Sequence, residues 1–150
     1  MSVIQRSIII DAPMEQVFEV LEDPNHVPQY APGVSRVDDV QRSEERVGDS
    51  YRTVCSVMGL DFPTKFTTLE YERPRKFIAQ MDGAMTGDFT WTLAPQDGST
   101  QMNLRIDYEM KGGILGKAMD TLLVERMNQK NAERMLENLK MLSEASQPPS

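Results

Sequence analysis

Histidine and cysteine are almost missing from this sequence, which holds one of each, His26 and Cys55, in 150 residues. A single histidine excludes metal sites built from several histidines. His26 falls in the polar stretch 23–26, where we expect a solvated loop residue rather than a base at the mouth of a pocket. Cys55 has no candidate base near it in the sequence, so a small packing residue is expected there instead of a nucleophile.

Long apolar runs are also missing, and no stretch approaches the roughly 18 residues of a membrane span. The N-terminus lacks a basic region followed by an apolar one, so no signal peptide is predicted. A lone cysteine forms no internal disulfide, which fits a cytoplasmic location. The formal net charge of −7 disfavours nucleic acid and anionic membranes as partners.

The first 24 residues predict a strand followed by a short helix. The run 8–10 is Ile-Ile-Ile, which favours a strand. Asp11 is a candidate helix cap, and Pro13 suits the first helical turn. An apolar stripe at helical spacing follows, formed by Met14, Val17, Phe18 and Leu21. Asp23-Pro24 ends this helix, and a short helical turn is expected over 24–30.

The middle of the chain is divided by turn signals such as Gly48-Asp49, Arg73-Pro74 and Asp82-Gly83. Residues 101–110 alternate strictly between apolar and polar side chains, the pattern of a strand with one buried face. The same alternation predicts a strand over 85–93. Weaker patterns predict strands over 34–40, 50–57, 61–72 and 76–81. Short connections between them indicate an antiparallel meander.

The chain closes with one long predicted helix, from residue 114 to about residue 145, after Gly112-Gly113. An apolar stripe that includes Met119 and Leu122 marks its early covering face. The segment 147–150 is expected to be a disordered tail, so a single domain over 1–146 is predicted. This order predicts an α+β fold: a seven-stranded curved antiparallel sheet wrapped around the closing helix, with two short helices after the first strand.

Short motifs along nearly the whole chain resemble the START-like (SRPBCC) superfamily, which has the helix-grip fold. They are Ile10-Asp-Ala-Pro13, Tyr30-Ala-Pro-Gly-Val34, Val47-Gly48-Asp49, Glu72-Arg-Pro74 and Gly113-Ile-Leu-Gly-Lys117. More narrowly, the chain resembles the bacterial polyketide cyclase/dehydrase branch. The resemblance implies a cavity between sheet and helix, and in the related cyclases polar pocket residues, often an arginine and hydroxyl groups, that orient a polyketide. No unambiguous match to such a polar set is found in this sequence.

The inward faces of the predicted elements supply the candidate lining of such a cavity. Methionine and aromatic side chains adapt to apolar ligands of varied shape. The candidate ligand-binding residues are Tyr30, Tyr51, Cys55, Phe66, Met81, Phe89, Trp91, Met102, Leu104, Ile106, Tyr108, Met119, Leu122 and Arg126.

Arg126 is the charged member of this set. It follows Leu122 by four residues and Met119 by seven, so it shares their predicted helix face. One alternative is that its side chain extends to solvent. The other is that its guanidinium enters the cavity and binds an acidic or carbonyl head group. Asn131 is a weaker case of the same kind.

Two functions remain open. The first is binding or carriage of a hydrophobic or amphipathic small molecule, by a monomer or a homodimer. The second is a reaction of the polyketide cyclase, aromatase or dehydrase type on an aromatic or polyketide-like substrate. The sequence offers no catalytic constellation, metal ligand set or cofactor motif, which favours the first function.

Overall fold

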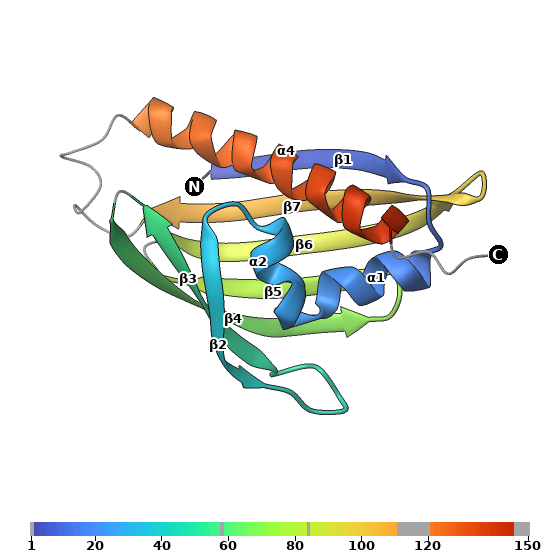
Figure 1. Ribbon diagram of the computed structural model, residues 1–150, viewed down its shortest axis with the longest axis horizontal. Helices are drawn as coiled ribbons and strands as arrows, with labels where there is room; N and C mark the ends of the chain where they lie inside the picture. Colours follow the sequence, from blue (N-terminus) through green and yellow to red (C-terminus); the bar gives the residue numbers. More distant parts are fainter. Residues whose placement is uncertain (1, 58, 84, 111–120, 146–150) are drawn as a thin grey trace.

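The computed structural model describes residues 2–57, 59–83, 85–110 and 121–145, and these form one curved sheet with helices on its concave side (Figure 1). The strands are β1 (Ser2–Ile10), β2 (Val34–Gln41), β3 (Ser50–Val57), β4 (Leu60–Glu72), β5 (Lys76–Asp82), β6 (Met85–Gln96) and β7 (Ser99–Met110). The helices are α1 (Met14–Glu22), the 3-10 turn η1 (Pro24–His26), α2 (Val27–Tyr30) and α4 (Thr121–Ala145).

The sheet has seven strands in the order β1-β7-β6-β5-β4-β3-β2, and every neighbouring pair is antiparallel. Strands β2 to β7 therefore form the predicted meander, and β1 joins it beside β7. The α4 helix runs diagonally across the concave side (Figure 1). The expected α+β architecture, with a curved seven-stranded sheet around the closing helix, is confirmed.

The strand β7 shows how the alternating pattern fixes the sheet. Its inward side chains are buried, from Thr100 through Met102 and Leu104 to Tyr108. Its outward side chains meet solvent, and Arg105 there donates to Asp107 at 2.9 Å. Burying one face and leaving the other wet is the arrangement that period-two alternation encodes.

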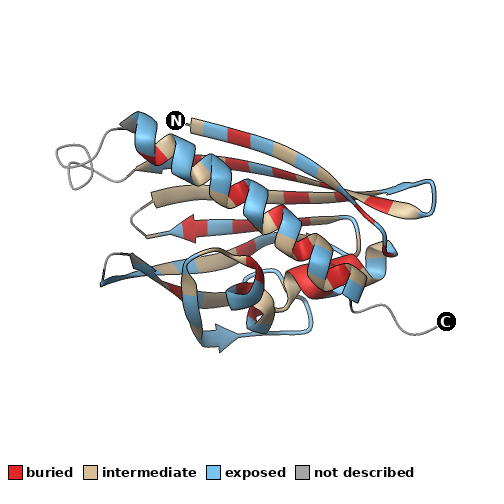
Figure 2. Ribbon diagram, turned by 45° about the horizontal axis from the view of Figure 1, so that its top comes forward, coloured by how far each residue is buried: buried red, intermediate tan, exposed pale blue. Residues whose placement is uncertain are grey.

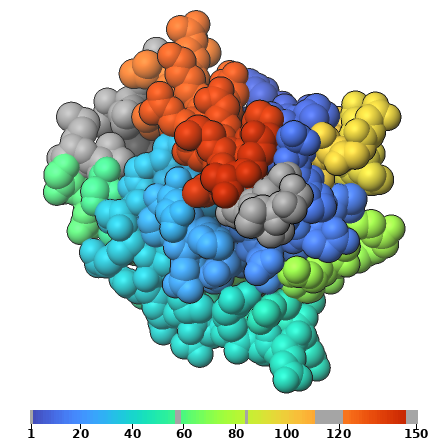
Figure 3. All heavy atoms as spheres, turned by 45° about the vertical axis from the view of Figure 1, so that its right-hand side comes forward, coloured from blue at the N-terminus to red at the C-terminus, as the bar shows by residue number. Residues whose placement is uncertain are grey.

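Helix α1 closes one end of the sheet. Val17, Phe18 and Leu21 from the predicted stripe are buried there. The Nε2 atom of Gln16 donates to the backbone oxygen of Ser143 at 2.6 Å, which joins α1 to the C-terminal part of α4. Figure 3 views this end, where the red atoms of α4 lie directly against the blue atoms of the N-terminal region.

The prediction that Asp11 caps α1 is wrong. The capping position is Pro13, and no side chain supplies a capping hydrogen bond there. Asp11 precedes that position by two residues and contacts the neighbouring elements instead. Its backbone N–H donates to Glu144 of α4, and its carboxylate accepts from Ser99 in β7.

Figure 2 shows how burial follows this arrangement, with buried positions on the side of α4 that faces the sheet and exposed positions on its outer side. The predicted helix start at 114, the side chain of Met119 and the expected tail 147–150 all lie outside the described residues. No helix among the described residues is long and apolar enough to cross a membrane.

Candidate functional site

A cavity of about 180 Å³ lies between the concave face of the sheet and α4. All seven strands, the α2 segment and one face of α4 contribute to its wall. It is lined by Ile4, Val27, Tyr30, Ala31, Pro32, Val34, Tyr51, Thr53, Cys55, Thr64, Phe66, Phe77, Ala79, Met81, Met85, Phe89, Trp91, Ile106, Tyr108, Asn128, Asn131, Ala132 and Met135.

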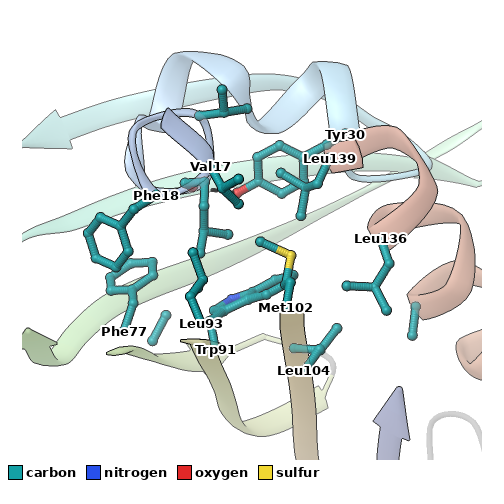
Figure 4. Packing of buried hydrophobic residues seen from close by; sticks show 14 of the residues in the cluster. Val17, Phe18, Tyr30, Phe77, Trp91, Leu93, Met102, Leu104, Leu136 and Leu139 are labelled. Carbon is teal, nitrogen blue, oxygen red and sulfur yellow. Dashed lines mark hydrogen bonds between the residues drawn. The ribbon is translucent and has the colours of Figure 1, made fainter. Parts of the chain in front are cut away.

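The cavity occupies only part of the space under α4, because α1 fills the rest. Figure 4 shows Val17 of α1 and Leu139 of α4 packed together with Leu93 and Met102 from the sheet. Met102 is 0% exposed and Leu104 is 1% exposed, and neither lines the cavity. The prediction that these two residues form part of the cavity wall is therefore wrong, because both are packed within the hydrophobic core instead.

Aromatic rings form a continuous wall on the sheet side of the cavity. Tyr51 and Phe66 stack with ring centroids 5.5 Å apart. Phe66 meets Phe89 edge to face at 5.7 Å, and Phe89 lies 6.5 Å from Trp91. Such pairs stabilise a wall beyond the effect of their buried area, and they present ring faces and edges to anything inside the cavity.

The register of the sheet places two tyrosines in one transverse row. Tyr51 pairs with Phe66, Phe66 with Met81, Met81 with Gly87, and Gly87 with Tyr108. Tyr51 on β3 and Tyr108 on β7 thus lie four strand spacings apart, each spacing being about 4.8 Å. Both face the cavity, and Gly87 between them contributes no side chain.

Three tyrosines line the cavity, and their hydroxyls differ in what they contact. Tyr30 donates to the backbone oxygen of Leu21 at 3.1 Å. The hydroxyls of Tyr51 and Tyr108 have no hydrogen-bond partner among the described residues. Burial raises the pKa of Tyr30, helped by neighbouring Tyr51 and by Asp23, and burial alone raises the pKa of Tyr51. The phenols of Tyr30 and Tyr51 therefore stay protonated at neutral pH.

Helix α4 supplies the opposite wall through Asn128, Asn131, Ala132 and Met135. These positions recur at helical spacing on one face. The Asn128 amide lies 3.6 Å from the sulfur of Met85, a weak contact, and the Asn131 amide has no hydrogen-bond partner among the described residues. This face adds amide groups to the hydroxyl groups of the other walls.

Leu122 and Arg126 do not line the cavity, so their predicted place in its wall is wrong. Leu122 is 53% exposed, and Arg126 is also exposed. The buried side of this part of the helix holds Val124. Two residues correspond to about 200° of rotation around an α-helix, which turns Leu122 and Arg126 away from the sheet together. The solvent-facing alternative for Arg126 is the one that the structure supports.

Cys55 lines the cavity and is half-buried, and burial raises the pKa of its thiol. A raised pKa lowers the fraction of thiolate and so the nucleophilicity of the residue at neutral pH. His26 lies away from the cavity lining, where its Nδ1 atom is 3.0 Å from the backbone oxygen of Val20. Cys55 and His26 therefore do not form a catalytic pair.

The cavity lining is uncharged: it includes no aspartate, glutamate, lysine, arginine or histidine among the residues that the structure describes. The same part of the chain holds no group of three or more side chains suited to a metal ion. The polar atoms that face the cavity are hydroxyl, amide and thiol groups. They donate and accept hydrogen bonds but do not supply a fixed charge.

The structure thus brings most of the predicted lining together. The predicted residues that do line the cavity are Tyr30, Tyr51, Cys55, Phe66, Met81, Phe89, Trp91, Ile106 and Tyr108. Sequence reasoning missed Asn128, Thr53 and Thr64 among the polar residues. Residues 51, 53 and 55 of β3 lie on one face of the strand, so the two-residue period could have predicted that Thr53 faces the cavity with Tyr51 and Cys55. The sequence gives no sign that Asn128 faces the cavity. Inward positions on a helix are recognised by their apolar side chains, and asparagine is polar.

Comparison with known proteins identifies the family. A family model described as polyketide cyclase / dehydrase and lipid transport matches residues 1–144. The chain belongs to this family. A search of curated proteins found no match.

Solved structures share the fold at low sequence identity. TTHA0849 from Thermus thermophilus is 23% identical with a TM-score of 0.83, over 98% of this chain and 100% of that one. The Zhui aromatase/cyclase from a Streptomyces species is 15% identical with a TM-score of 0.80, over 95% and 93%. A START superfamily protein from Mycobacterium smegmatis is 13% identical with a TM-score of 0.79, over 97% and 99%. These likenesses establish the helix-grip fold that the resemblance implied.

Proposed function

We propose that this protein binds a hydrophobic or amphipathic small molecule in the cavity between its sheet and α4. The observation that carries the proposal is the cavity itself, about 180 Å³ of space with a predominantly aromatic and aliphatic lining. Protein interiors are normally close-packed, and an apolar space of this size favours an apolar occupant over water. Membership of a family that includes lipid transport supports the same function.

A cyclase or dehydrase reaction is the second candidate, favoured by the fold shared with the Zhui aromatase/cyclase. General acid–base catalysis of such a reaction needs a group with a pKa near the working pH. The described cavity lining offers only hydroxyl groups and one cysteine thiol for proton transfer, and burial raises the pKa of Tyr51 and Cys55. Binding without turnover therefore has the stronger support.

Trp91 provides a direct test of binding. It is the only tryptophan of the chain, it is 3% exposed, and it lines the cavity. Titration with aliphatic probes that do not absorb with the indole, such as farnesol and decanol, should shift or quench Trp91 fluorescence. Native mass spectrometry of freshly purified protein should show a copurified small molecule, and its mass would indicate the class of the natural ligand.

Variants that fill the cavity with a larger side chain test whether binding occurs there. Ala132 lines the cavity from α4, so Ala132→Phe should abolish the fluorescence response, while Lys130→Phe at an exposed position of the same helix should retain it. A smaller change, Ala79→Val, reduces the volume from the sheet side if the first variant fails to fold. Binding that survives both filled variants would contradict a site in this cavity. Turnover of a polyketide-like substrate by the wild-type chain would favour the enzyme.

A further inference from the structure

The two unpartnered tyrosine hydroxyls of the cavity differ from the tyrosine beside them. Tyr108 is only 3% exposed, yet its hydroxyl has no hydrogen-bond partner among the described residues, and the same holds for the Tyr51 hydroxyl. Tyr30 lies in the same wall and donates its hydroxyl proton to the Leu21 backbone. Neither hydroxyl oxygen is among the fully buried polar atoms without a partner, so each keeps accessible surface. Because both tyrosines line the cavity, a ligand inside it can reach these hydroxyls.

The chemistry of these hydroxyls suits them to ligand oxygen atoms. A phenol hydroxyl can donate one hydrogen bond. The backbone acceptors of the strands that carry Tyr51 and Tyr108 are engaged in the antiparallel ladder of the sheet. A ligand carbonyl, ester or hydroxyl oxygen inside the cavity would accept from them.

The lining also restricts the charge of the occupant. No ionisable acid or base other than the tyrosines and Cys55 lines the cavity among the described residues, and Arg126 is exposed. An ionised head group would lose its hydration on entry and find no counter-charge. An uncharged molecule does not incur this cost.

Size and wall composition restrict the shape. The cavity of about 180 Å³ is slightly larger than an engineered cavity of about 150 Å³ that binds benzene. The contiguous rings of Tyr51, Phe66, Phe89 and Trp91 offer faces and edges for aromatic packing. One or two rings suit this space better than the two acyl chains of a membrane lipid.

We propose that the ligand is an uncharged compound of one or two rings that carries a carbonyl or hydroxyl oxygen, and that the hydroxyl of Tyr51 or of Tyr108 donates a hydrogen bond to that oxygen. This inference rests on the proposed binding function and specifies its ligand class. Arg126 takes no part in ligand binding under this inference. Specificity depends instead on Tyr51 and Tyr108, which lie in one row of the sheet.

Calorimetric titration with three naphthalene compounds tests the charge. Methyl 2-naphthoate is an uncharged ester, 2-naphthoate is the corresponding anion, and naphthalene has the rings without oxygen. The ester should bind at least about tenfold more tightly than the anion, because only the anion carries an uncompensated charge into the cavity. Equal affinity of ester and anion would overturn the uncharged-ligand inference.

Three matched variants test the hydrogen bonds. At least one of Tyr51→Phe and Tyr108→Phe should weaken the ester by about threefold to tenfold, and both should leave naphthalene binding unchanged. Tyr71→Phe should leave both affinities unchanged, since Tyr71 lies outside the cavity lining and its hydroxyl donates to Glu22. A loss of naphthalene affinity equal to that of the ester, or no loss for the ester in either variant, would overturn the assigned role. Failure of both the ester and naphthalene to bind the wild-type chain would overturn the proposed function as well.

Discussion

The hydroxyl of Tyr30 donates a hydrogen bond of 3.1 Å to the backbone oxygen of Leu21, which links α2 to the last turn of α1. The backbone oxygen of Tyr30 in turn accepts from the Asn138 side chain of α4 at 3.1 Å. Tyr30 thus connects helices α1, α2 and α4. Its position beside the cavity follows from this structural role.

Replacing Tyr30 by phenylalanine should lower the free energy of unfolding by about 1 kcal/mol, because the Leu21 oxygen loses its donor in a buried setting. Urea denaturation followed by circular dichroism measures this change. Tyr51→Phe is the matched control and should leave stability unchanged or slightly raised. Equal losses for the two variants would contradict the different roles of their hydroxyls.

Gly87 permits the close approach of β6 and β7 beneath the cavity. A Cβ atom at this position would lie 1.9 Å from the backbone oxygen of Asp107, and backbone atoms of a paired strand have little freedom to move. Gly87→Ala should therefore lower the free energy of unfolding by about 2–4 kcal/mol.

Gly98 is the control for this prediction. It has φ +86°, but a Cβ atom there would meet nothing within 4 Å. Gly98→Ala should cost only about 1–2 kcal/mol, the penalty of the left-handed backbone alone. Thermal or urea unfolding compares the two variants. A cost at Gly87 no larger than that at Gly98 would argue against the clash.

The sheet was predictable from the sequence because its signals are local. Strict alternation over β7 identifies both the strand and its buried face, and the turn signals around Gly48 and Pro74 separate the neighbouring strands. The start of α1 was less predictable. A helix can begin without a side-chain cap, and the contacts that Asp11 makes instead are tertiary ones that the local pattern does not contain.

The wall of the cavity was predictable on the sheet and poorly predictable on α4. A strand face repeats every two residues, so Tyr51 and Cys55 follow directly from the pattern. On α4, apolar residues occur on both faces, since Leu122, Leu123 and Met127 are exposed. Because no side of the helix is clearly polar, the sequence does not determine which face of α4 turns toward the sheet. The predicted position of Arg126 near the cavity is wrong for this reason.

Arg126→Met tests the corrected rotation of α4. The arginine is exposed and lies outside the cavity lining, so the substitution should change the affinity for methyl 2-naphthoate and for 2-naphthoate by less than about twofold. Calorimetry on wild type and variant measures both constants. A selective loss of 2-naphthoate affinity would return Arg126 to the binding site.

The single cysteine offers a chemical measure of cavity occupancy. Burial raises the pKa of Cys55, so N-ethylmaleimide should modify it more slowly in the folded protein than in urea. A bound ligand should slow the reaction further, because Cys55 lines the cavity. The control is Cys55→Ser combined with Lys130→Cys, which puts the thiol at an exposed position of α4. Ligand should leave its labelling rate unchanged, and equal protection at both positions would point to a general effect of the ligand.

Alkaline pH should destabilise the protein through its tyrosines. Burial raises the pKa of Tyr30 and Tyr51, and burial followed by the hydrogen bond to Glu22 raises the pKa of Tyr71. The unfolded chain ionises its tyrosines near pH 10, so above that pH it has lost protons that the folded chain keeps. The stabilising contribution is complete below pH 10 and declines as pH rises toward the folded-state pKa values.

Each tyrosine that ionises only on unfolding should lower the free energy of unfolding by about 1.4 kcal/mol per pH unit in this range. Urea titrations between about pH 9 and pH 11.5 give the slope, and absorbance at about 295 nm follows phenolate formation. Tyr51→Phe should reduce the slope by the share of one tyrosine, since its pKa is raised by burial in the cavity wall. Phenolate formation at Tyr51 before unfolding, with an unchanged slope in the variant, would mean that solvent reaches this hydroxyl freely.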